Sequence, residues 1–225
     1  MQILRKSDLT EGGFAGLKEH QLVMDKQAFG SHRNPQTWDG LGNFVYLADA
    51  RFMPKGETLM HGHKEVDVIS VMVKGRINHE GSLEHGQMMH AKQAQVQRAG
   101  GEGFSHNEVN PDNEENQMIQ LWVLPEQNGQ KAGYKFYRPK LGELTRIYGG
   151  DSEQDTTFAS NTQIYVANLE AGNVIEQNAE SLMYISEGEV IVDGERFEAG
   201  TLIRSEAFKL EATSSAQVIV IDEKA

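Results

Sequence analysis

Cysteine is absent from the 225-residue sequence. Without thiols the chain can form no disulfide, no zinc–thiolate site and no cysteine nucleophile, although this absence does not fix the cellular compartment. No apolar run approaches the roughly 18 residues that a membrane-spanning helix needs. The polar start MQILRKSDLTEGG lacks the apolar core of a signal peptide. We therefore expect a soluble, cytoplasmic protein.

Positive charge is also scarce, because 21 Lys and Arg residues face 33 Asp and Glu residues and the net charge is -12. Nucleic-acid backbones and anionic membrane surfaces are bound by clustered Lys and Arg. We therefore expect neither nucleic acid nor a membrane as a partner. The length suits one large domain or two small ones, either of which can bury a core.

The dominant pattern is that of short β-strands. Runs of β-branched and aromatic residues are bounded by turn pairs such as Lys74-Gly75 and Glu187-Gly188. The predicted strands are VDVISVMV (66–73), QMIQLWVL (117–124), TQIYVANL (162–169), SLMYIS (181–186), EVIVDG (189–194) and AQVIVID (216–222). Many short strands with frequent turns predict sandwiches or closed barrels. Only residues 8–20 and 140–148 have a helical pattern.

The chain divides into two halves. Residues 125–160 are polar and rich in turn residues, and the strand pattern resumes at residue 162. VMVKGRI (71–77) and YISEGEVIV (184–192) share one pattern, an apolar strand, a charged residue with glycine, and a second apolar strand. This repeat indicates a duplicated β-barrel, with one domain on each side of the polar region.

All eight histidines lie in the first half of the chain. His61 and His63 are two residues apart, and so are His106 and Glu108. On a strand this spacing places both side chains on one face. A single pair of this kind is usually solvent-exposed, but two pairs on adjacent strands of a barrel would bring together three imidazoles and one carboxylate. Such a donor set suits a borderline divalent metal and leaves positions open for substrate and dioxygen.

Two segments carry a resemblance to a known family. GETLMHGHKEVD (56–67) resembles the first motif of cupins, and GFSHNEVN (103–110) resembles the second. The phrases MQILRKSD, GLGNFVYLADARFMPKGE and QLWVLPEQNG, together with SHNEVNP, are similar to pirin and the bacterial pirin-like proteins over residues 1–137. The resemblance implies an all-β bicupin with two jelly-roll barrels. We expect an N-terminal metal-binding cupin at residues 1–137 and a shortened C-terminal cupin without metal ligands at residues 138–225.

The resemblance places the family's metal ligands on His61, His63, His106 and Glu108. It implies one divalent transition metal, with Fe(II) expected and Mn, Ni, Cu, Co and Zn as alternatives. Asp67 falls where many cupins have a ligand carboxylate, and we interpret it as a polar neighbour of the ligands or as an outward-facing side chain. Asn110 is expected to hold a turn through backbone hydrogen bonds.

Other positions carry further expectations. His79, His85 and His90 alternate with polar residues, and we expect all three to be solvated. Pirin-like proteins have an aromatic phrase similar to HTFSF near the start, where this chain has HQLVMDKQAF. Leu22 and Met24 replace both aromatic residues of that phrase, so an aromatic substrate would lose stacking partners if this segment lines the pocket.

The resemblance implies a metal-dependent dioxygenase that opens flavonols such as quercetin. Its substrates would be a small aromatic or enol compound and O2, and Glu108 would take the proton of the flavonol 3-hydroxyl. An alternative is a non-enzymatic, metal-dependent regulator that binds a protein partner. A third is an inert cupin that binds a small ligand or a sugar. The sequence leaves open whether the protein is an enzyme.

Overall fold

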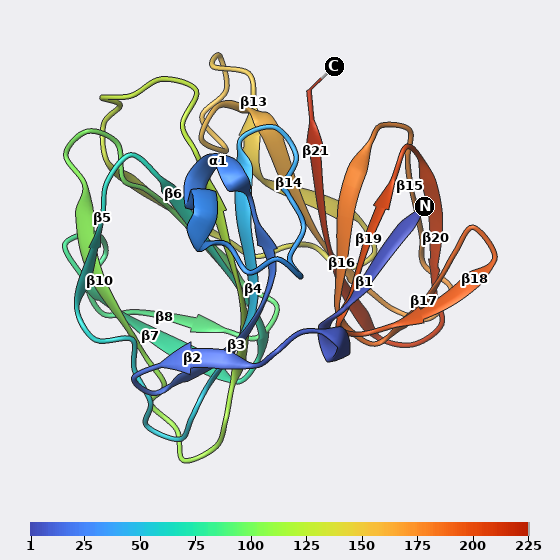
Figure 1. Ribbon diagram of the computed structural model, residues 1–225, viewed down its shortest axis with the longest axis horizontal. Coiled ribbons are helices and arrows are strands. Elements are labelled where there is room, and N and C mark those ends of the chain that lie inside the picture. Colours follow the sequence, from blue (N-terminus) through green and yellow to red (C-terminus); the bar gives the residue numbers. More distant parts are fainter. Residues whose placement is uncertain (225) are drawn as a thin grey trace. The chain divides into compact units, whose positions relative to one another are not determined.

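A computed structural model describes residues 1–224, which are mostly β-strand (Figure 1). The chain forms two compact units. The N-terminal unit comprises Thr10–Asp39 and Asn43–Arg138. The C-terminal unit comprises Met1–Leu9, Gly40–Gly42 and the chain from Pro139 onward. The domain boundary expected between residues 137 and 138 stays a prediction.

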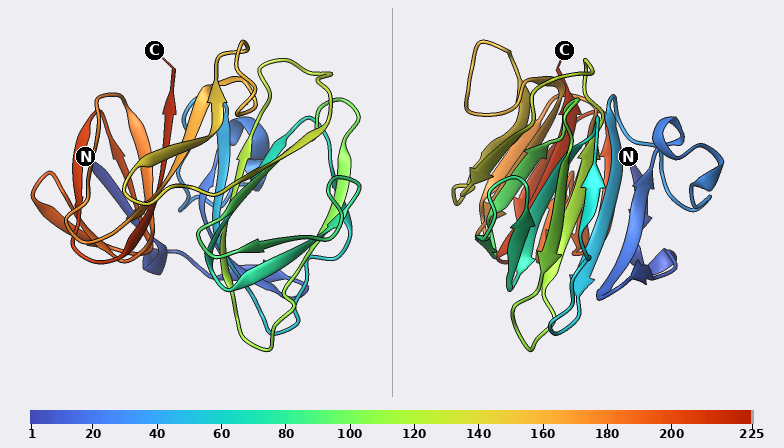
Figure 2. Two further views of the ribbon diagram at one scale, coloured as in Figure 1. Left: turned by 180° about the vertical axis from the view of Figure 1, so that it is seen from behind. Right: turned by 90° about the vertical axis from the view of Figure 1, so that its left-hand side faces the viewer.

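The N-terminal unit contains a seven-stranded and a four-stranded antiparallel sheet. The larger sheet has, in spatial order, β12 (Gly133–Tyr137), β9 (Ala94–Arg98), β6 (Asp67–Lys74), β11 (Gln117–Val123), β4 (Phe44–Phe52), β3 (Leu17–Met24) and β2 (Gly12–Phe14). The smaller sheet has β5 (His61–His63), β10 (Phe104–Val109), β7 (Arg76–Gly81) and β8 (Gln87–His90). Strands β3 and β4 lie side by side in both views of Figure 2.

The C-terminal unit contains a six-stranded and a four-stranded sheet. The larger sheet has β1 (Gln2–Arg5), β19 (Thr201–Ser205), β16 (Ser181–Glu187), β21 (Ala216–Glu223), β14 (Ser160–Leu169) and β13 (Leu144–Gly150). The smaller sheet has β15 (Val174–Gln177), β20 (Phe208–Ala212), β17 (Glu189–Val192) and β18 (Glu195–Glu198). The two units together give the bicupin fold that the sequence predicts.

Helices are few and short. They are α1 (Lys26–Phe29) and the 3-10 turns η1 (Lys6–Asp8) and η2 (Gly30–His32). Within residues 1–224, no helix has the length and apolar character needed to cross a membrane.

Each predicted strand run forms a strand, in β6, β11, β14, β16, β17 and β21. The two helical predictions are wrong. Residues 8–20 form β2 and the start of β3, and residues 140–148 lead into β13. In β3 the buried Leu17 and Glu19 alternate with the exposed Lys18, which is the period of a strand with one buried face.

The repeated strand–glycine–strand pattern corresponds to the same local structure in both units. Gly75 lies between β6 and β7 with φ 75°, and Gly188 lies between β16 and β17 with φ 81°. A side chain at either position would also collide with a neighbour, because a Cβ would lie 2.9 Å from the Asn116 Cβ and 2.1 Å from the Ser215 carbonyl oxygen. Both turns therefore require glycine.

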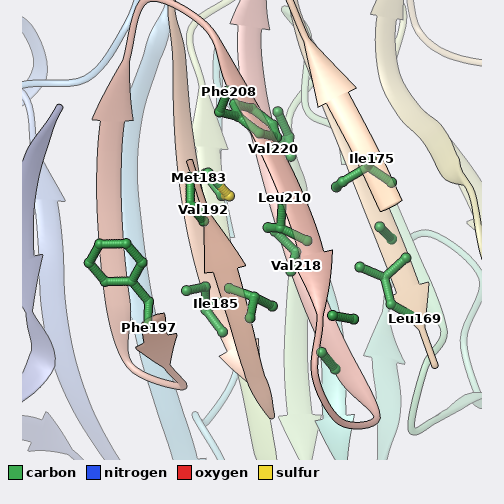
Figure 3. Close-up of a cluster of buried hydrophobic side chains, with 14 of the residues drawn as sticks. Leu169, Ile175, Met183, Ile185, Val192, Phe197, Phe208, Leu210, Val218 and Val220 are labelled. Atoms are coloured by element: carbon green, nitrogen blue, oxygen red, sulfur yellow. The ribbon is translucent and has the colours of Figure 1, made fainter. Parts of the chain in front are cut away.

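The two units bury different interiors. The C-terminal unit is filled by aliphatic and aromatic side chains from both of its sheets, including Ile185, Phe208, Leu210 and Val218 (Figure 3). The N-terminal unit has smaller apolar clusters; the buried residues of one of them are Leu17, Ala50, Phe52, Met72, Ile77, Met89 and Met118. Polar side chains occupy part of the remaining interior of the N-terminal unit, and the predicted metal ligands are among them.

Candidate metal centre

Strands β5 and β10 bring the two predicted ligand pairs together. They pair antiparallel, with His61 opposite His106 and His63 opposite Phe104. Directly opposed residues of an antiparallel pair project to the same face. His63 therefore lies on the same face as His61 and His106, as the spacing of the sequence predicts.

The three imidazoles converge through their Nε2 atoms. The Nε2 atom of His106 lies 3.1 Å from that of His61 and 3.2 Å from that of His63. Two nitrogens that bind one metal at about 2.1 Å and at right angles lie about 3.0 Å apart. Ring nitrogens of the three residues lie within 4.8 Å of one another. The donor set therefore fits one transition-metal ion.

The backbone sets the tautomer of His61. Its Nδ1 atom lies 2.8 Å from the carbonyl oxygen of Leu59. Because a carbonyl can only accept, Nδ1 carries the proton and the Nε2 lone pair faces the other histidines. Leu59 has φ 65°, a left-handed conformation that non-glycine residues adopt infrequently. The backbone before β5 therefore takes a strained conformation where it positions this ring.

Burial keeps the other two imidazoles neutral. The pKa of His63 is lowered to about 4, first by burial and then by the neighbouring His61. The pKa of His106 is lowered to about 2 by burial and by the charges of His61, His63 and His79. Neutral imidazoles have the free lone pair that metal binding requires.

Glu108 is buried, and it lines a cavity together with these histidines. Its Oε1 accepts hydrogen bonds from Ser70 Oγ at 2.9 Å and Gln95 Nε2 at 3.2 Å. Burial raises the pKa of the Glu108 carboxyl to about 7, against the opposing effect of these two hydrogen bonds. Gln95 is held in turn by the hydroxyl of Tyr134, which donates to its Oε1 at 3.0 Å. The roles of Glu108 as fourth ligand and as base stay predictions.

His79 is fully buried, so its predicted solvation is wrong, whereas His85 and His90 are exposed as expected. The cause is register, since β7 pairs with β10 and sets His79 opposite the inward-facing Glu108. The ring centres of His79 and His106 are 5.5 Å apart. Nε2 of His79 lies 2.8 Å from the Leu83 carbonyl oxygen, which fixes its proton there.

Two further predicted residues have structural partners. Asp67 lies on the face of β6 opposite to Ser70, as the outward-facing interpretation expects, but it is buried and forms an ion pair with Arg98 at 3.2 Å. Asn110 is buried, and its side-chain amide donates to the carbonyl oxygens of Met53 at 3.0 Å and Glu114 at 2.7 Å. The predicted role of Asn110 in holding a turn is confirmed.

A cavity with an empty volume of about 420 Å³, including its open mouth, lies against the three histidines. Its aromatic walls are Phe14, Tyr46, Phe52 and Trp122, and the rings of Tyr46 and Trp122 stack with centres 4.5 Å apart. The cavity lining does not include Leu22 or Met24. The condition under which stacking partners would be lost is therefore not met in this cavity, and other strands supply its aromatic rings.

Sequence reasoning missed several residues of this cavity. Glu19, Tyr46 and Trp122 line it, and they come from β3, β4 and β11. Their only signal in the sequence is alternation along each strand, as in the buried Leu17 and Glu19. Alternation indicates a shared face, but it does not reveal which strands are neighbours.

Comparisons with known proteins agree with the fold. The profile of the Pirin family matches residues 23–123. A candidate quercetin 2,3-dioxygenase of Zymomonas mobilis is 25% identical over 187 residues, which cover 77% of this chain and 79% of that protein. The quercetin 2,3-dioxygenase of Escherichia coli K12 is 30% identical over 76 residues, which cover 33% of this chain and 32% of that protein.

The nickel(II) complex of the bacterial pirin YhhW from Escherichia coli has a similar fold. It superposes with a TM-score of 0.82 at 18% identity, and the match covers 100% of this chain and 99% of that one. Residues 23–123 resemble the Pirin family, and the fold of the chain is that of the bacterial pirin YhhW.

Proposed function

We propose that this protein is a metal-dependent dioxygenase that opens the ring of a flavonol such as quercetin. The observation that carries the proposal is the convergence of three imidazoles beside the buried Glu108, in a cavity with aromatic walls. The names of its relatives support the same substrate class. In the reaction the substrate supplies the electrons that reduce O2. The C2–C3 and C3–C4 bonds of the flavonol break, one oxygen atom is added to each of C2 and C4, and C3 leaves as carbon monoxide.

The residues of the site would have different roles in the reaction. When bound, a divalent metal acidifies a coordinated hydroxyl and leaves positions open for oxygen. His61, His63 and His106 would hold that ion. Glu108 would accept the proton of the flavonol 3-hydroxyl, because a carboxyl with a pKa of about 7 can take up a proton near neutral pH. Ser70 would orient that carboxylate through its hydrogen bond to Oε1.

The cavity walls would position the substrate. A flavonol is planar and aromatic, and the stacked rings of Tyr46 and Trp122 offer a flat surface of matching character. Phe52 and Met118 are fully buried behind the cavity and keep water out of that part of the barrel. Restricted water access strengthens the electrostatic effect of Glu108 on the bound hydroxyl.

We propose Fe(II) as the resident metal. Three imidazole nitrogens and a carboxylate oxygen suit Fe(II) but also accept its neighbours Mn, Ni, Cu, Co and Zn. The nickel complex of YhhW is a property of that protein. The cytoplasmic location, and the expectation that nucleic acid and membranes are not partners, stay predictions from composition.

A second candidate function is metal-dependent regulation through a protein partner. The observation that favours it is the exposure of two large apolar side chains, Leu59 and Met60, directly before His61. In that case the same histidines bind the ion and no substrate is consumed. Oxygen consumption separates the two functions.

The test is oxygen uptake with quercetin by protein loaded anaerobically with Fe(II). We expect catalytic uptake that matches the loss of the flavonol absorbance. His90→Ala is the matched control, because His90 is exposed and lies outside the cavity, and it should keep full activity. Absence of turnover with Fe(II), Mn, Ni, Cu and Co would reject the enzyme and leave the regulator.

A further inference from the structure

A second acidic residue, Glu19, lines the cavity without belonging to the group of converging histidines. It lies on β3 and is 8% exposed. Its Oε2 accepts a hydrogen bond from the hydroxyl of Tyr46 at 3.1 Å, and its Oε1 accepts one from the side-chain amide of Gln21 at 2.9 Å. Two neutral donors therefore hold this carboxylate in a fixed position.

The surroundings make a carboxylate costly here. Apolar side chains of Leu17, Phe52 and Met118 line the same part of the barrel. Burial raises the pKa of Glu19, and the hydrogen bonds from Tyr46 and Gln21 only partly oppose this effect. A neutral side chain could fill the space at lower cost, because burying a charge without a cationic partner is unfavourable. A group retained at such a cost points to a function in binding.

The carboxylate of Glu19 can also accept further hydrogen bonds. A carboxylate has about four acceptor positions, and Tyr46 and Gln21 occupy one on each oxygen. A ligand in the cavity can therefore donate a hydrogen bond to Glu19 without displacing either neighbour. Such a bond to an anion is about twice as strong as one between neutral groups.

We propose that Glu19 is a recognition site for a phenolic hydroxyl of the substrate, distinct from the hydroxyl that faces the histidines. Tyr46 has two functions in this site, since its hydroxyl holds Glu19 and its ring, stacked on Trp122, forms the aromatic wall. The inference names the substrate class as aromatic compounds with hydroxyls at two separate positions. It rests on the proposed function only in assuming that one end of the ligand faces the metal.

The experiment compares the affinities of two flavonols. Quercetin has several hydroxyls, whereas 3-hydroxyflavone keeps only the one expected to face the metal. Calorimetry is done without oxygen on the full-length protein loaded with Zn(II), so that binding is measured without turnover. We expect the wild type to bind quercetin at least about tenfold more tightly, the effect of one hydrogen bond to a charged group. In Glu19→Gln this preference should fall below about threefold, since a neutral acceptor binds a donor more weakly.

Controls isolate the carboxylate. Glu115→Gln makes the same change at an exposed site outside the cavity and should keep the wild-type preference. Affinity for 3-hydroxyflavone should be the same in all of these proteins. If Glu19→Gln does not fold, Tyr46→Phe removes one of the groups that hold the carboxylate and should also lower the preference.

An unchanged preference in Glu19→Gln, or in Tyr46→Phe where that variant is used, would overturn the inference. Failure of the wild type to bind quercetin would overturn it too. The proposed function is judged separately, by oxygen uptake. If the preference is lost in Glu19→Gln and no flavonol is turned over, the recognition site stands and the dioxygenase assignment falls.

Discussion

The two units share the same strand–glycine–strand architecture, but they differ in the side chains that face their interiors. Counted back from the turn glycines Gly75 and Gly188, Ser70 of β6 and Met183 of β16 occupy the same place. Ser70 donates a hydrogen bond to Glu108, whereas Met183 packs in an apolar core. One barrel therefore uses this position to orient a functional carboxylate, and the other uses it to fill space.

This difference shows how a duplicated fold can separate function from stability. Buried polar groups of the N-terminal unit, such as Glu19 and Glu108, lose their hydration free energy. Their hydrogen bonds within the protein offset only part of this loss. In the C-terminal unit the cluster of Figure 3 buries aliphatic and aromatic side chains, which stabilises the fold directly. The contrast predicts that matched substitutions in the two units affect different measurements.

The largest effect is expected from His106→Ala. Removing the histidine whose Nε2 lies near both others leaves only two imidazoles, so metal content should fall from about one ion per chain to nearly none. The strand signal in circular dichroism should persist, because the apolar cluster around Ile77 and Met89 does not contain the histidines. Elemental analysis beside His90→Ala checks this. Full metal content in His106→Ala would reject the ligand assignment.

Glu108→Gln should come next, with a loss of oxygen uptake of about 100-fold or more. Glutamine keeps the size of the side chain and can still accept from Ser70, but it cannot take up the substrate proton. Some metal should remain, because three imidazoles are unchanged. The measurement is quercetin turnover per bound metal, with Glu115→Gln as the control. Equal turnover in Glu108→Gln would exclude this residue as the base.

In the C-terminal unit, Leu210→Ala tests the opposite side of the comparison. Leu210 is fully buried among the side chains of Figure 3, so its truncation should lower the free energy of unfolding by about 3 kcal/mol. Metal content should not change. Glu211→Ala, at the next and exposed position of β20, should change stability by less than about 0.5 kcal/mol. Urea unfolding measures both, and a metal loss in Leu210→Ala would show that the units are not separate in function.

The convergence of His61, His63 and His106 could be predicted because it depends on local spacing. Residues two apart share a face on any strand, and only the pairing of β5 with β10 had to be supplied by the resemblance to cupins. The strands of the C-terminal unit were equally accessible, since their apolar runs and turn glycines are local signals.

The rest of the site depends on which strands are neighbours. His79 lies in a polar hairpin segment and faces inward because its strand pairs with β10 opposite Glu108. Tyr46 and Trp122 stack because β4 pairs with β11, a contact between distant parts of the sequence. Glu19 was missed for a different reason. Residues 8–20 have a helical pattern in the sequence, so Glu19 was not expected on a strand. Such contacts follow from register, which a single sequence does not specify.

The smallest effect is expected from His79→Phe, which probes how the N-terminal unit holds its ligands. When Nε2 of His106 binds a metal, the proton of the ring lies on Nδ1, which is buried without a hydrogen-bond partner among residues 1–224. His79 has its proton on Nε2, which leaves a bare Nδ1 that is also buried and unpartnered within the same residues. One atom is a donor and the other an acceptor, on rings with centres 5.5 Å apart.

A small rotation or one bridging water would join these two atoms, and the link would fix the orientation of His106. Residues that orient a ligand in this way typically change metal affinity by about 10–100-fold. We expect His79→Phe to weaken Zn(II) binding by about tenfold in competition with a chelator, and His79→Gln, which retains an acceptor, to recover part of the loss. Imidazole nitrogen NMR of His106 reports its tautomer directly. Unchanged affinity and an unchanged His106 spectrum in His79→Phe would show that the buried His79 only fills space, like its counterparts in the apolar barrel.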